Sequence, residues 1–362
     1  MRHVVFVLPS LRGGGAERVF LQLANELSKT TKVSLLLFME EGPFMDLVEQ
    51  RVSIHSLAVE RARYAYRKLK KVLLKLNPDV VFSTHDRVNV MLGLMKKSLP
   101  NHTKVFLRQT NVLSLYLLSQ SNFKRVIKKY FFSYSYQRAD AIIAQCQEMK
   151  DDLIKTLPQL SKPIHVIYNP INQAFIEQSM VEFNPYKSYD EKIIVASGRL
   201  SEQKDFRTLI QAFEILHRKD SKTRLFILGD GPLRDDLSRL VNDVKLQNVV
   251  HFTGFVNNPY PYYHFADVFV LSSKYEGFPN VLLEALTTNV KVVATNCPTG
   301  VKEIMNQASL SHLTVTVGDF KSMSEKIVFA LNQSPNVTID MSRYYLTNIS
   351  GAYFSLMDVD DQ

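Results

Sequence analysis

The sequence of 362 residues is long enough for two domains, and its 46% hydrophobic and 22% charged residues are typical of a soluble globular protein. It has no apolar run near the roughly 20 residues that cross a bilayer, and its start, MRHVVFVLPSLRGGG, lacks the long apolar region of a signal peptide. The two cysteines, Cys146 and Cys297, supply neither a disulfide framework nor a cysteine-built metal site, so we expect a cytosolic protein.

Short apolar runs alternate with longer amphipathic segments along the chain. Continuous apolar runs separated by helices predict parallel sheets that are covered on both faces. Two such series predict an α/β protein of two doubly wound domains, whose ligands bind beyond the carboxyl ends of the strands. The expected strands are 3–9, 33–38, 52–58, 79–85, 104–110 and 141–146 in the first half, and 192–198, 223–229, 249–254, 268–273, 291–295 and 313–317 in the second.

The polar stretch between about 170 and 191 interrupts this alternation and indicates the domain boundary. We therefore predict a first domain of residues 1–185 and a second of residues 186–340. The last segment, 341–362, is a candidate for a return to the first domain.

The net charge of +9 is concentrated in the first domain. Residues 1–185 carry 26 Lys and Arg against 15 Asp and Glu, whereas residues 186–362 carry 18 against 20. This asymmetry indicates that the first domain meets a polyanion, either an anionic membrane surface or a nucleic acid. The alternative is a basic face that only meets solvent.

Residues 9–18, PSLRGGGAER, form a glycine-rich turn between an expected strand and an expected helix. Glycines let a ligand approach the backbone, and the start of a helix attracts anions. A dinucleotide fingerprint would need glycines at 13, 15 and 18, but position 18 is Arg18. The turn therefore favours an anion other than a nicotinamide dinucleotide, or else it serves only the path of the chain.

In the second domain, SGRLSEQKD follows the first expected strand and contains Arg199 and Lys204. Two cations at the carboxyl end of a strand can clamp one diphosphate, although such residues are also common on soluble surfaces. LGDGPLRDDL (228–237) is a second glycine-containing turn between a strand and a helix.

The stretch SSKYEGFPNVLLEAL places two carboxylates around a helix start. Glu276 lies in a loop, Pro279 suits the first helical turn, and Glu284 lies inside the helix. An ionised carboxylate accepts two hydroxyl groups of a sugar or ribose. The alternatives are that Glu276 interacts with the helix dipole and that Glu284 is partly exposed.

Together, GGGAERV, GRLSEQKD, LGDGPLRDDL, FTGFVNNPYPYYHFADVFVLSSKYEGFPNVLLEAL and CPTGVKEI resemble glycosyltransferase family 4 over nearly the whole chain. That family is a retaining group with the GT-B fold, in which two Rossmann-like domains face each other across an interdomain cleft. The resemblance implies a retaining hexosyltransferase. Its substrates would be a nucleotide sugar, most often a UDP-sugar, and a lipid-linked or polysaccharide acceptor in bacterial surface-glycan biosynthesis.

The resemblance also implies a role for each matched residue. Arg199 and Lys204 would bind the donor diphosphate, Glu276 the transferred sugar, and Glu284 the ribose. The remaining donor contacts would be Gly14 and Gly15 in the first loop, Gly254 and Phe255 at the base, and Gly277 and Phe278 beside the sugar.

One feature departs from the family pattern, because many members carry a histidine after a strand of the first domain. Here the corresponding stretch is FLRQTN. Either His85, or Arg108 and Asn111, would then line the acceptor side, unless these polar residues merely close strand ends. A sugar-nucleotide-binding protein without catalysis is therefore an alternative function.

The reaction that the family implies is front-face attack, in which the donor phosphate accepts the proton of the acceptor hydroxyl. No carboxylate nucleophile stands out in the sequence. We expect neither a metal nor another cofactor, because the one D-x-D motif, Asp358–Asp360, lies in the terminal tail.

Residues 61–76 and 122–140 are basic and amphipathic, which suits attachment to an anionic membrane surface. We therefore expect a cytoplasmic protein that is peripheral on the inner face of the cell membrane. The rival partner is a nucleic acid, but no recognition-helix, zinc or RNA-sheet motif is present, so we expect none.

Overall fold

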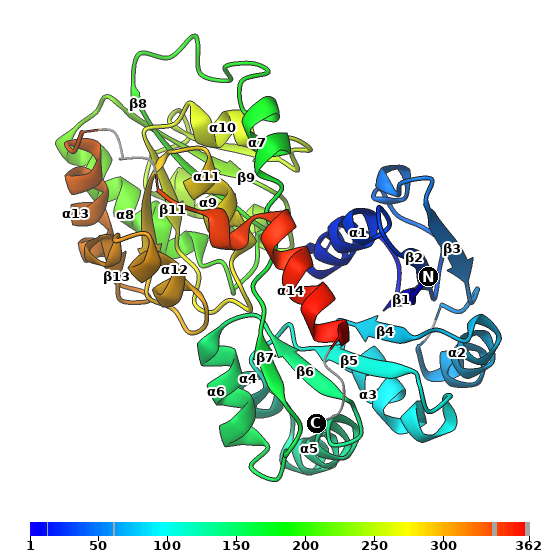
Figure 1. Ribbon diagram of the computed structural model, residues 1–362. Helices are drawn as coiled ribbons and strands as arrows, with labels where there is room; N and C mark the ends of the chain where they lie inside the picture. The colour runs from blue at the N-terminus through cyan, green and yellow to red at the C-terminus, as the bar shows by residue number, and fades with distance from the viewer. Residues whose placement is uncertain (13, 61, 335–338, 359–362) are drawn as a thin grey trace. The chain divides into compact units, whose positions relative to one another are not determined.

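The computed structural model describes residues 1–12, 14–60, 62–334 and 339–358 (Figure 1). Three residues considered above lie outside them: Gly13 of the glycine run, Arg61 at the start of the first basic segment, and Asp360 of the D-x-D motif. The chain forms two compact units, one of residues 1–170 with 344–362 and one of residues 171–343.

The division between the units lies earlier than the predicted boundary at residue 185. Residues 171–185 belong to the second unit, because the helix α7 (Gln173–Ser179) packs against two helices of that unit, α10 and α11. The side-chain amide of Asn258 also donates to the carbonyl of Ser179, at 3.1 Å. The chain returns to the first unit at Tyr344.

The first unit is a seven-stranded parallel sheet in the order β3-β2-β1-β4-β5-β6-β7. Six strands confirm the sequence prediction, and the seventh, β7, was missed because it has three half-buried residues at the sheet edge. The strands are β1 (His3–Leu8), β2 (Lys32–Leu37), β3 (Val52–Ser56), β4 (Val80–Ser83), β5 (Lys104–Arg108), β6 (Ala141–Ala144) and β7 (Ile164–Val166).

Helices of the first unit follow its strands in turn, with short 3-10 turns at Met45–Leu47 and Lys96–Ser98. They are α1 (Gly15–Leu27), α2 (Ala62–Leu76), α3 (Asp86–Met95), α4 (Leu113–Leu118), α5 (Asn122–Tyr136) and α6 (Gln147–Thr156). The unit is completed by α14 (Leu346–Asp358), which packs against α1 (Figure 1). Tyr353 of α14 lies edge-on to Phe82 in the core, with ring centroids 5.1 Å apart.

The second unit is a six-stranded parallel sheet in the order β10-β9-β8-β11-β12-β13. All six strands that we predicted are present: β8 (Lys192–Ser197), β9 (Thr223–Leu228), β10 (Val250–Gly254), β11 (Val268–Leu271), β12 (Lys291–Thr295) and β13 (Thr314–Val315). Its helices, besides α7, are α8 (Phe206–Lys219), α9 (Arg234–Asp243), α10 (Tyr260–His264), α11 (Asn280–Thr287), α12 (Val301–Gln307) and α13 (Phe320–Leu331), with a 3-10 turn at Ser311–Leu313. A further 3-10 turn, Ser342–Tyr344, lies where the chain returns to the first unit.

Both sheets confirm the predicted doubly wound arrangement, because the direction of strand addition reverses within each of them. The reversal lies between β1 and β4 in the first unit and between β8 and β11 in the second. Most side chains of the central strands are buried, including all of β1 and Ile193–Ala196 of β8, which accounts for their apolar runs. Ligands of this fold class bind at such a reversal, beyond the carboxyl ends of the strands.

Candidate functional site

The loops that follow β8 and β11 lie against each other at the reversal of the second sheet. The amide group of Gln203, in the first loop, donates to the carbonyl of Tyr275 in the second, at 2.9 Å. The backbone N–H of Lys274 donates in turn to the carbonyl of Gln203, at 2.8 Å. The two loops therefore bring together Lys204 of GRLSEQKD and Glu276 of SSKYEGFPNVLLEAL.

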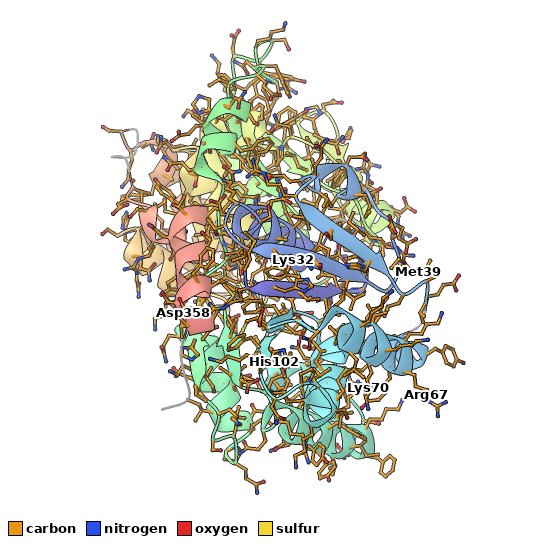
Figure 2. The ribbon with its side chains drawn as sticks, turned by 45° about the vertical axis from the view of Figure 1, so that its right-hand side comes forward. Lys32, Met39, Arg67, Lys70, His102 and Asp358 are labelled. Atoms are coloured by element: carbon orange, nitrogen blue, oxygen red, sulfur yellow. The ribbon has the colours of Figure 1, made fainter. Side chains whose placement is uncertain are left out.

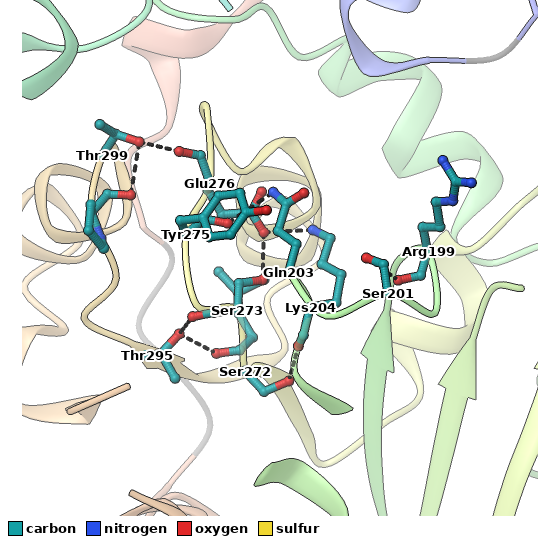
Figure 3. Close-up of polar contacts among 12 residues, drawn as sticks. Arg199, Ser201, Gln203, Lys204, Ser272, Ser273, Tyr275, Glu276, Thr295 and Thr299 are labelled. Carbon is teal, nitrogen blue, oxygen red and sulfur yellow. Dashed lines mark hydrogen bonds and ion pairs between the residues drawn. The ribbon is translucent and has the colours of Figure 1, made fainter. Parts of the chain in front are cut away.

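Lys204 and Glu276 form an ion pair at the centre of this region (Figure 3). The ammonium Nζ of Lys204 lies 2.6 Å from Oε1 of Glu276, and the two side chains are 15% and 7% exposed. The hydroxyl of Ser273 donates to the same oxygen at 2.6 Å. Both donors use Oε1, and no hydrogen bond to Oε2 is found among the described residues. The carboxylate is thus fixed at one oxygen and open at the other.

The loop that follows β12 fixes the backbone of Glu276. The hydroxyl of Thr299 donates to the carbonyl of Glu276, and Thr295 donates to the carbonyl of Ser273 at 2.6 Å (Figure 3). Thr299 has a φ of +66°, which a β-branched residue rarely adopts. Such a conformation persists only where the surrounding structure imposes it. Thr299 therefore holds the loop that carries Glu276.

Glycine at position 198 leaves room for the side chain of Lys204. A Cβ there would lie 2.8 Å from Cε of Lys204, and the φ of Gly198 is +152°, which favours glycine. The neighbouring Gly229 needs to be small for a related reason, since its Cβ would lie 2.1 Å from the carbonyl oxygen of Gly198. Gly198 and Gly229 therefore allow the loops that follow β8 and β9 to pack closely.

Arg199 lies on the same loop as Lys204, but the structure does not bring the two cations together. Its side chain is exposed and points away from the Lys204–Glu276 pair (Figure 3). No hydrogen bond or ion pair of its guanidinium is found within the described residues. In this structure Lys204 faces Glu276, whereas Arg199 faces solvent.

The other residues of the stretch around Glu276 lie where the sequence predicted. Glu276 is in the loop and Glu284 is inside α11, half-buried and with a polar partner. Gly277 is half-buried in the loop, and Phe278 is buried. The ring of Phe278 lies against Gly300, where an added Cβ would be 2.7 Å from its Cδ2.

Gly254 and Phe255 lie at the end of β10, two strands from β8. Gly254 has a φ of +75°, and its carbonyl accepts from the N–H of Gly229 at 2.7 Å. Phe255 is exposed, although most phenylalanines of the chain's core strands are buried. A free aromatic ring beside the carboxyl end of β10 is available to stack on a flat ligand.

The cysteine near Glu276, Cys297, is buried. Burial, with the negative charge of Glu276 adding to it, raises the pKa of the Cys297 thiol to about 12. The thiol is therefore protonated at neutral pH, and only a thiolate attacks effectively.

In the first unit, Gly14 and Gly15 are exposed at the start of α1. The carboxylate of Glu17 accepts from the N–H of Gly14 at 2.8 Å, as the acidic residue of a capping box does. The start of α1 thus already has an anion at one of its N–H groups. Any phosphate that binds this loop would share it with Glu17.

A cavity of about 1100 Å³ lies at the carboxyl ends of the first sheet, and it includes two of the predicted acceptor-side residues, His85 and Asn111. Its walls combine apolar side chains such as Phe131 and Met91 with charged ones such as Arg87 and Lys128. Apolar walls with a few converging polar groups are typical of binding pockets for small molecules.

Asp86, which the sequence analysis did not single out, lies beside His85 in the wall of this cavity. Burial raises the pKa of the Asp86 carboxyl and lowers the pKa of His85, because it disfavours the charged form of each group. Oδ1 of Asp86 and Nε2 of His85 are both buried and have no hydrogen-bond partner within the described structure. Asn111 donates to Oδ2 of Asp86 at 3.4 Å.

Arg108 does not line the cavity, because its side chain is fully buried behind it. Its guanidinium donates to Thr84 at 2.7 Å and to the side-chain oxygen of Asn169, and Asn89 donates to its carbonyl at 3.0 Å. These contacts fit a residue that closes the end of a strand better than one that contacts an acceptor directly. Of the acceptor-side predictions, His85 and Asn111 share a cavity, whereas Arg108 is enclosed.

Sequence reasoning missed Ser273, Thr299 and Asp86. Ser273 follows β11 directly, in the SSKYEGF stretch, so its proximity to Glu276 had a local signal. Thr299 lies within CPTGVKEI, but one helix, α11, and one strand, β12, separate it from Glu276 in the chain, so no local pattern reveals their contact.

The chain matches two protein-family models. One, described as glycosyl transferases group 1, matches residues 181–344, and the other, described as glycosyltransferase family 4, matches residues 13–175.

Two similar proteins are an enzyme of Campylobacter jejuni and a protein of Methanocaldococcus jannaschii. The first is an N-acetylgalactosamine-N,N'-diacetylbacillosaminyl-diphospho-undecaprenol 4-alpha-N-acetylgalactosaminyltransferase, 29% identical over 334 residues, which are 89% of this chain and 88% of the enzyme. The second is an uncharacterised glycosyltransferase, 34% identical over 253 residues, which are 66% of this chain and 60% of the protein.

Solved structures share the fold. Anabaena Alr3699/HepE, in complex with UDP and glucose, matches with a TM-score of 0.82 and 18% identity over 99% of both chains. Sucrose-phosphate synthase from Thermosynechococcus elongatus matches with a TM-score of 0.78 and 15% identity over 98% of both chains.

Proposed function

The chain belongs to the glycosyltransferases with the GT-B fold, and we propose that it transfers a sugar from a nucleotide donor to the hydroxyl of an acceptor. The donor would be a UDP-sugar carrying a hexose or an N-acetylhexosamine. The acceptor would be a lipid-linked or polysaccharide glycan of a bacterial surface. The transfer would retain the anomeric configuration.

The arrangement of Glu276 is the observation that carries this proposal. Lys204 and Ser273 hold Oε1, and Oε2 remains open within the described structure. An open carboxylate oxygen accepts hydroxyl groups, which a sugar offers in pairs. The nearby ammonium group suits the diphosphate that adjoins the same sugar. One pair of side chains would thus meet both parts of a nucleotide sugar.

Lys204 would act on the leaving group. When the glycosidic bond breaks, the electron pair of that bond passes to the diphosphate oxygen, and negative charge develops there. A cation that is already in position stabilises this charge without reorganising, which is often the largest single contribution to catalysis. Arg199 would join it if the exposed guanidinium swings toward the bound diphosphate.

Retention would follow from attack on the same face that the diphosphate leaves. The acceptor hydroxyl forms a bond to the anomeric carbon while the bond to the diphosphate breaks, and the hydroxyl proton passes to a phosphate oxygen. Attack on this face needs no covalent intermediate between the sugar and a side chain such as Glu276 or Cys297.

The UDP-sugar and the lipid-linked acceptor are supported by the relatives. Alr3699/HepE has been crystallised with UDP, with UDP and glucose, and with UDP-glucose. The Campylobacter relative acts on a diphospho-undecaprenol glycan. The apolar and charged walls of the first unit's cavity suit an acceptor sugar, with His85, Asp86 and Asn111 as its hydrogen-bonding groups.

The test is turnover of a panel of labelled nucleotide sugars with lipid-diphosphate and oligosaccharide acceptors, in buffer with and without a metal chelator. We expect one UDP-sugar to give a product whose new linkage keeps the donor's anomeric configuration, as NMR would establish. Glu276→Gln should keep UDP affinity, because it removes an anion that competes for Lys204, yet lose most of the transfer. Binding without turnover of any donor would instead favour a sugar-nucleotide-binding protein, and an inverted linkage would refute the retaining mechanism.

A further inference from the structure

Helix α5 has two apolar faces, although the first unit covers one of them only. The inner face, with Phe132 and Tyr136, is buried, and the helix packs there against α3 (Figure 1). The outer face presents Phe123, Val126 and Tyr130, which are 77%, 70% and 63% exposed. Ile127, Phe131 and Tyr134 are exposed as well.

The outer side chains form one continuous stripe. Residues 123, 126, 127, 130 and 134 recur at three- and four-residue intervals, which is the spacing of one helical face. Tyr130 stacks on Tyr134, with ring centroids 6.0 Å apart. Single exposed apolar residues are ordinary, but a contiguous apolar stripe rimmed by polar groups marks an interaction surface.

The charges around this stripe have one sign. Lys124 and Lys129 flank it, are exposed, and have no ion-pair or hydrogen-bond partner within the described residues. The sequence contains no Asp or Glu between Asp86 and Asp140. A surface that combines aromatic and aliphatic side chains with unpaired lysines fits the boundary between anionic headgroups and acyl chains.

The other basic helix, α2, has two exposed apolar residues among its described side chains, Tyr64 and Leu74, which lie ten positions apart. Its Ala65, Leu69 and Leu73 are fully buried, so its apolar face belongs to the core of the unit. Arg67 extends from the outer side of the helix (Figure 2). From the sequence, residues 61–76 and 122–140 had the same predicted role in membrane attachment, because periodicity does not reveal which apolar faces the fold covers.

We propose that the outer face of α5 docks this protein on an anionic lipid bilayer, with Phe123, Val126 and Tyr130 inserted among the headgroups. None of the described helices is both apolar and long enough to span a membrane. A second copy of the chain fits the outer face of α5 less well than a bilayer does. A symmetric pair would place Lys124 and Lys129 of one copy opposite the same residues of the other.

The inference rests on the proposed function in one respect: an enzyme whose acceptor is anchored in lipid has to work at a membrane surface. The cavity with the candidate acceptor residues includes Phe131 and Lys128 of this same helix in its wall. Docking through α5 would therefore place the cavity beside the bilayer.

The absence of tryptophan from the sequence allows a sharp test. Phe123→Trp puts a single fluorescent reporter on the outer face of α5, and Tyr64→Trp puts a matched reporter on an exposed position of α2. With vesicles of phosphatidylglycerol and phosphatidylcholine, we expect emission of the α5 reporter to shift to the blue and that of the α2 reporter to stay unchanged. Pure phosphatidylcholine should leave both unchanged.

Three outcomes would overturn the proposal. They are no shift at position 123, an equal shift at both positions, and a shift without vesicles that grows with protein concentration, which would indicate a second copy on this face. In flotation with the same vesicles, Lys124→Gln and Lys129→Gln should each weaken binding about fivefold at low salt, the change that corresponds to ~1 kcal/mol per basic residue.

A second set of variants separates this proposal from the proposed function. Phe123→Ser with Val126→Ser should lose vesicle binding but keep thermal stabilisation by nucleotides, which bind the other unit. Vesicle binding that is intact in a protein stabilised by no nucleotide would refute the proposed function and leave docking standing. Nucleotide stabilisation in a protein that never floats with vesicles would refute docking alone.

Discussion

Lys204 and Glu276 are 72 residues apart in the chain, and their charged groups lie 2.6 Å apart between the loops that follow β8 and β11. The cation that the sequence assigns to a diphosphate is therefore already paired with the carboxylate that it assigns to a sugar. A bound diphosphate would approach an ammonium whose charge is partly balanced. The pair thus keeps Lys204 in position before a donor binds.

Stability measurements would detect this pair without any substrate. Lys204→Met leaves the carboxylate of Glu276 buried without its cation, so we expect a loss approaching the ~3–5 kcal/mol that breaking a buried ion pair costs. Glu276→Gln in the same chain should recover much of that loss, because no buried charge remains. Urea unfolding of the single and double variants measures the coupling, and strictly additive effects would contradict the pair.

Gly198→Ala should disturb catalysis through the position of Lys204. The added Cβ would lie 2.8 Å from Cε of Lys204, in a backbone conformation that suits glycine. We expect kcat to fall toward the ~10²–10³-fold loss that removal of a charge-stabilising group causes. Gly351→Ala, in α14, meets no atom within 4 Å and serves as the matched control. Unchanged kcat in Gly198→Ala would show that the position of Lys204 does not matter.

Thr299 offers a test of how the backbone of Glu276 is held. Thr299→Val keeps the shape and the strained φ but removes the hydroxyl that donates to the carbonyl of Glu276, whereas Thr299→Ser keeps the hydroxyl. A hydrogen bond of this kind contributes ~1 kcal/mol, so we expect kcat/KM for the donor to fall roughly five- to tenfold in the valine variant. The serine variant should stay near wild type. Equal activity in both variants would exclude a positioning role for the hydroxyl.

Asp86 makes the stability of the protein depend on pH in a definite direction. Burial raises its pKa above the ordinary 3.8, so the folded state binds its proton more tightly than the unfolded state does. The contribution of Asp86 to stability is therefore greatest below 3.8 and declines as pH rises through the raised pKa. Asp86→Asn should gain stability relative to wild type across that interval, as urea unfolding at a series of pH values would measure. A difference that is constant with pH would contradict the raised pKa.

The strands were predicted well from the sequence, because a buried central strand such as β1 is apolar at every position from Val4 to Leu8. The sequence also placed Glu276 in a loop and Glu284 in a helix. The contact of Lys204 with Glu276 was not predictable, since it depends on how two loops pack after the strand order reverses. Spacing instead paired Lys204 with Arg199, whose side chain faces solvent.

Burial is the second kind of information that the sequence lacked. Arg108 and Asn111 were equivalent candidates by position, but Arg108 is enclosed by Thr84 and Asn169 while Asn111 lies in the cavity wall. The two basic helices looked alike for the same reason, although only α5 keeps an uncovered apolar face in the part of the chain that the structure describes.

The most direct test of the central claim is the thermal unfolding midpoint of the protein with a panel of nucleotides and nucleotide sugars. We expect UDP and one UDP-sugar to raise the midpoint by several degrees at concentrations about 100 times their dissociation constants. We also expect Glu284→Ala to abolish the shift, whereas Asp235→Ala, at an exposed position of α9, should retain it. No shift with any nucleotide, or an equal shift in Glu284→Ala, would contradict a nucleotide-sugar donor held at this site.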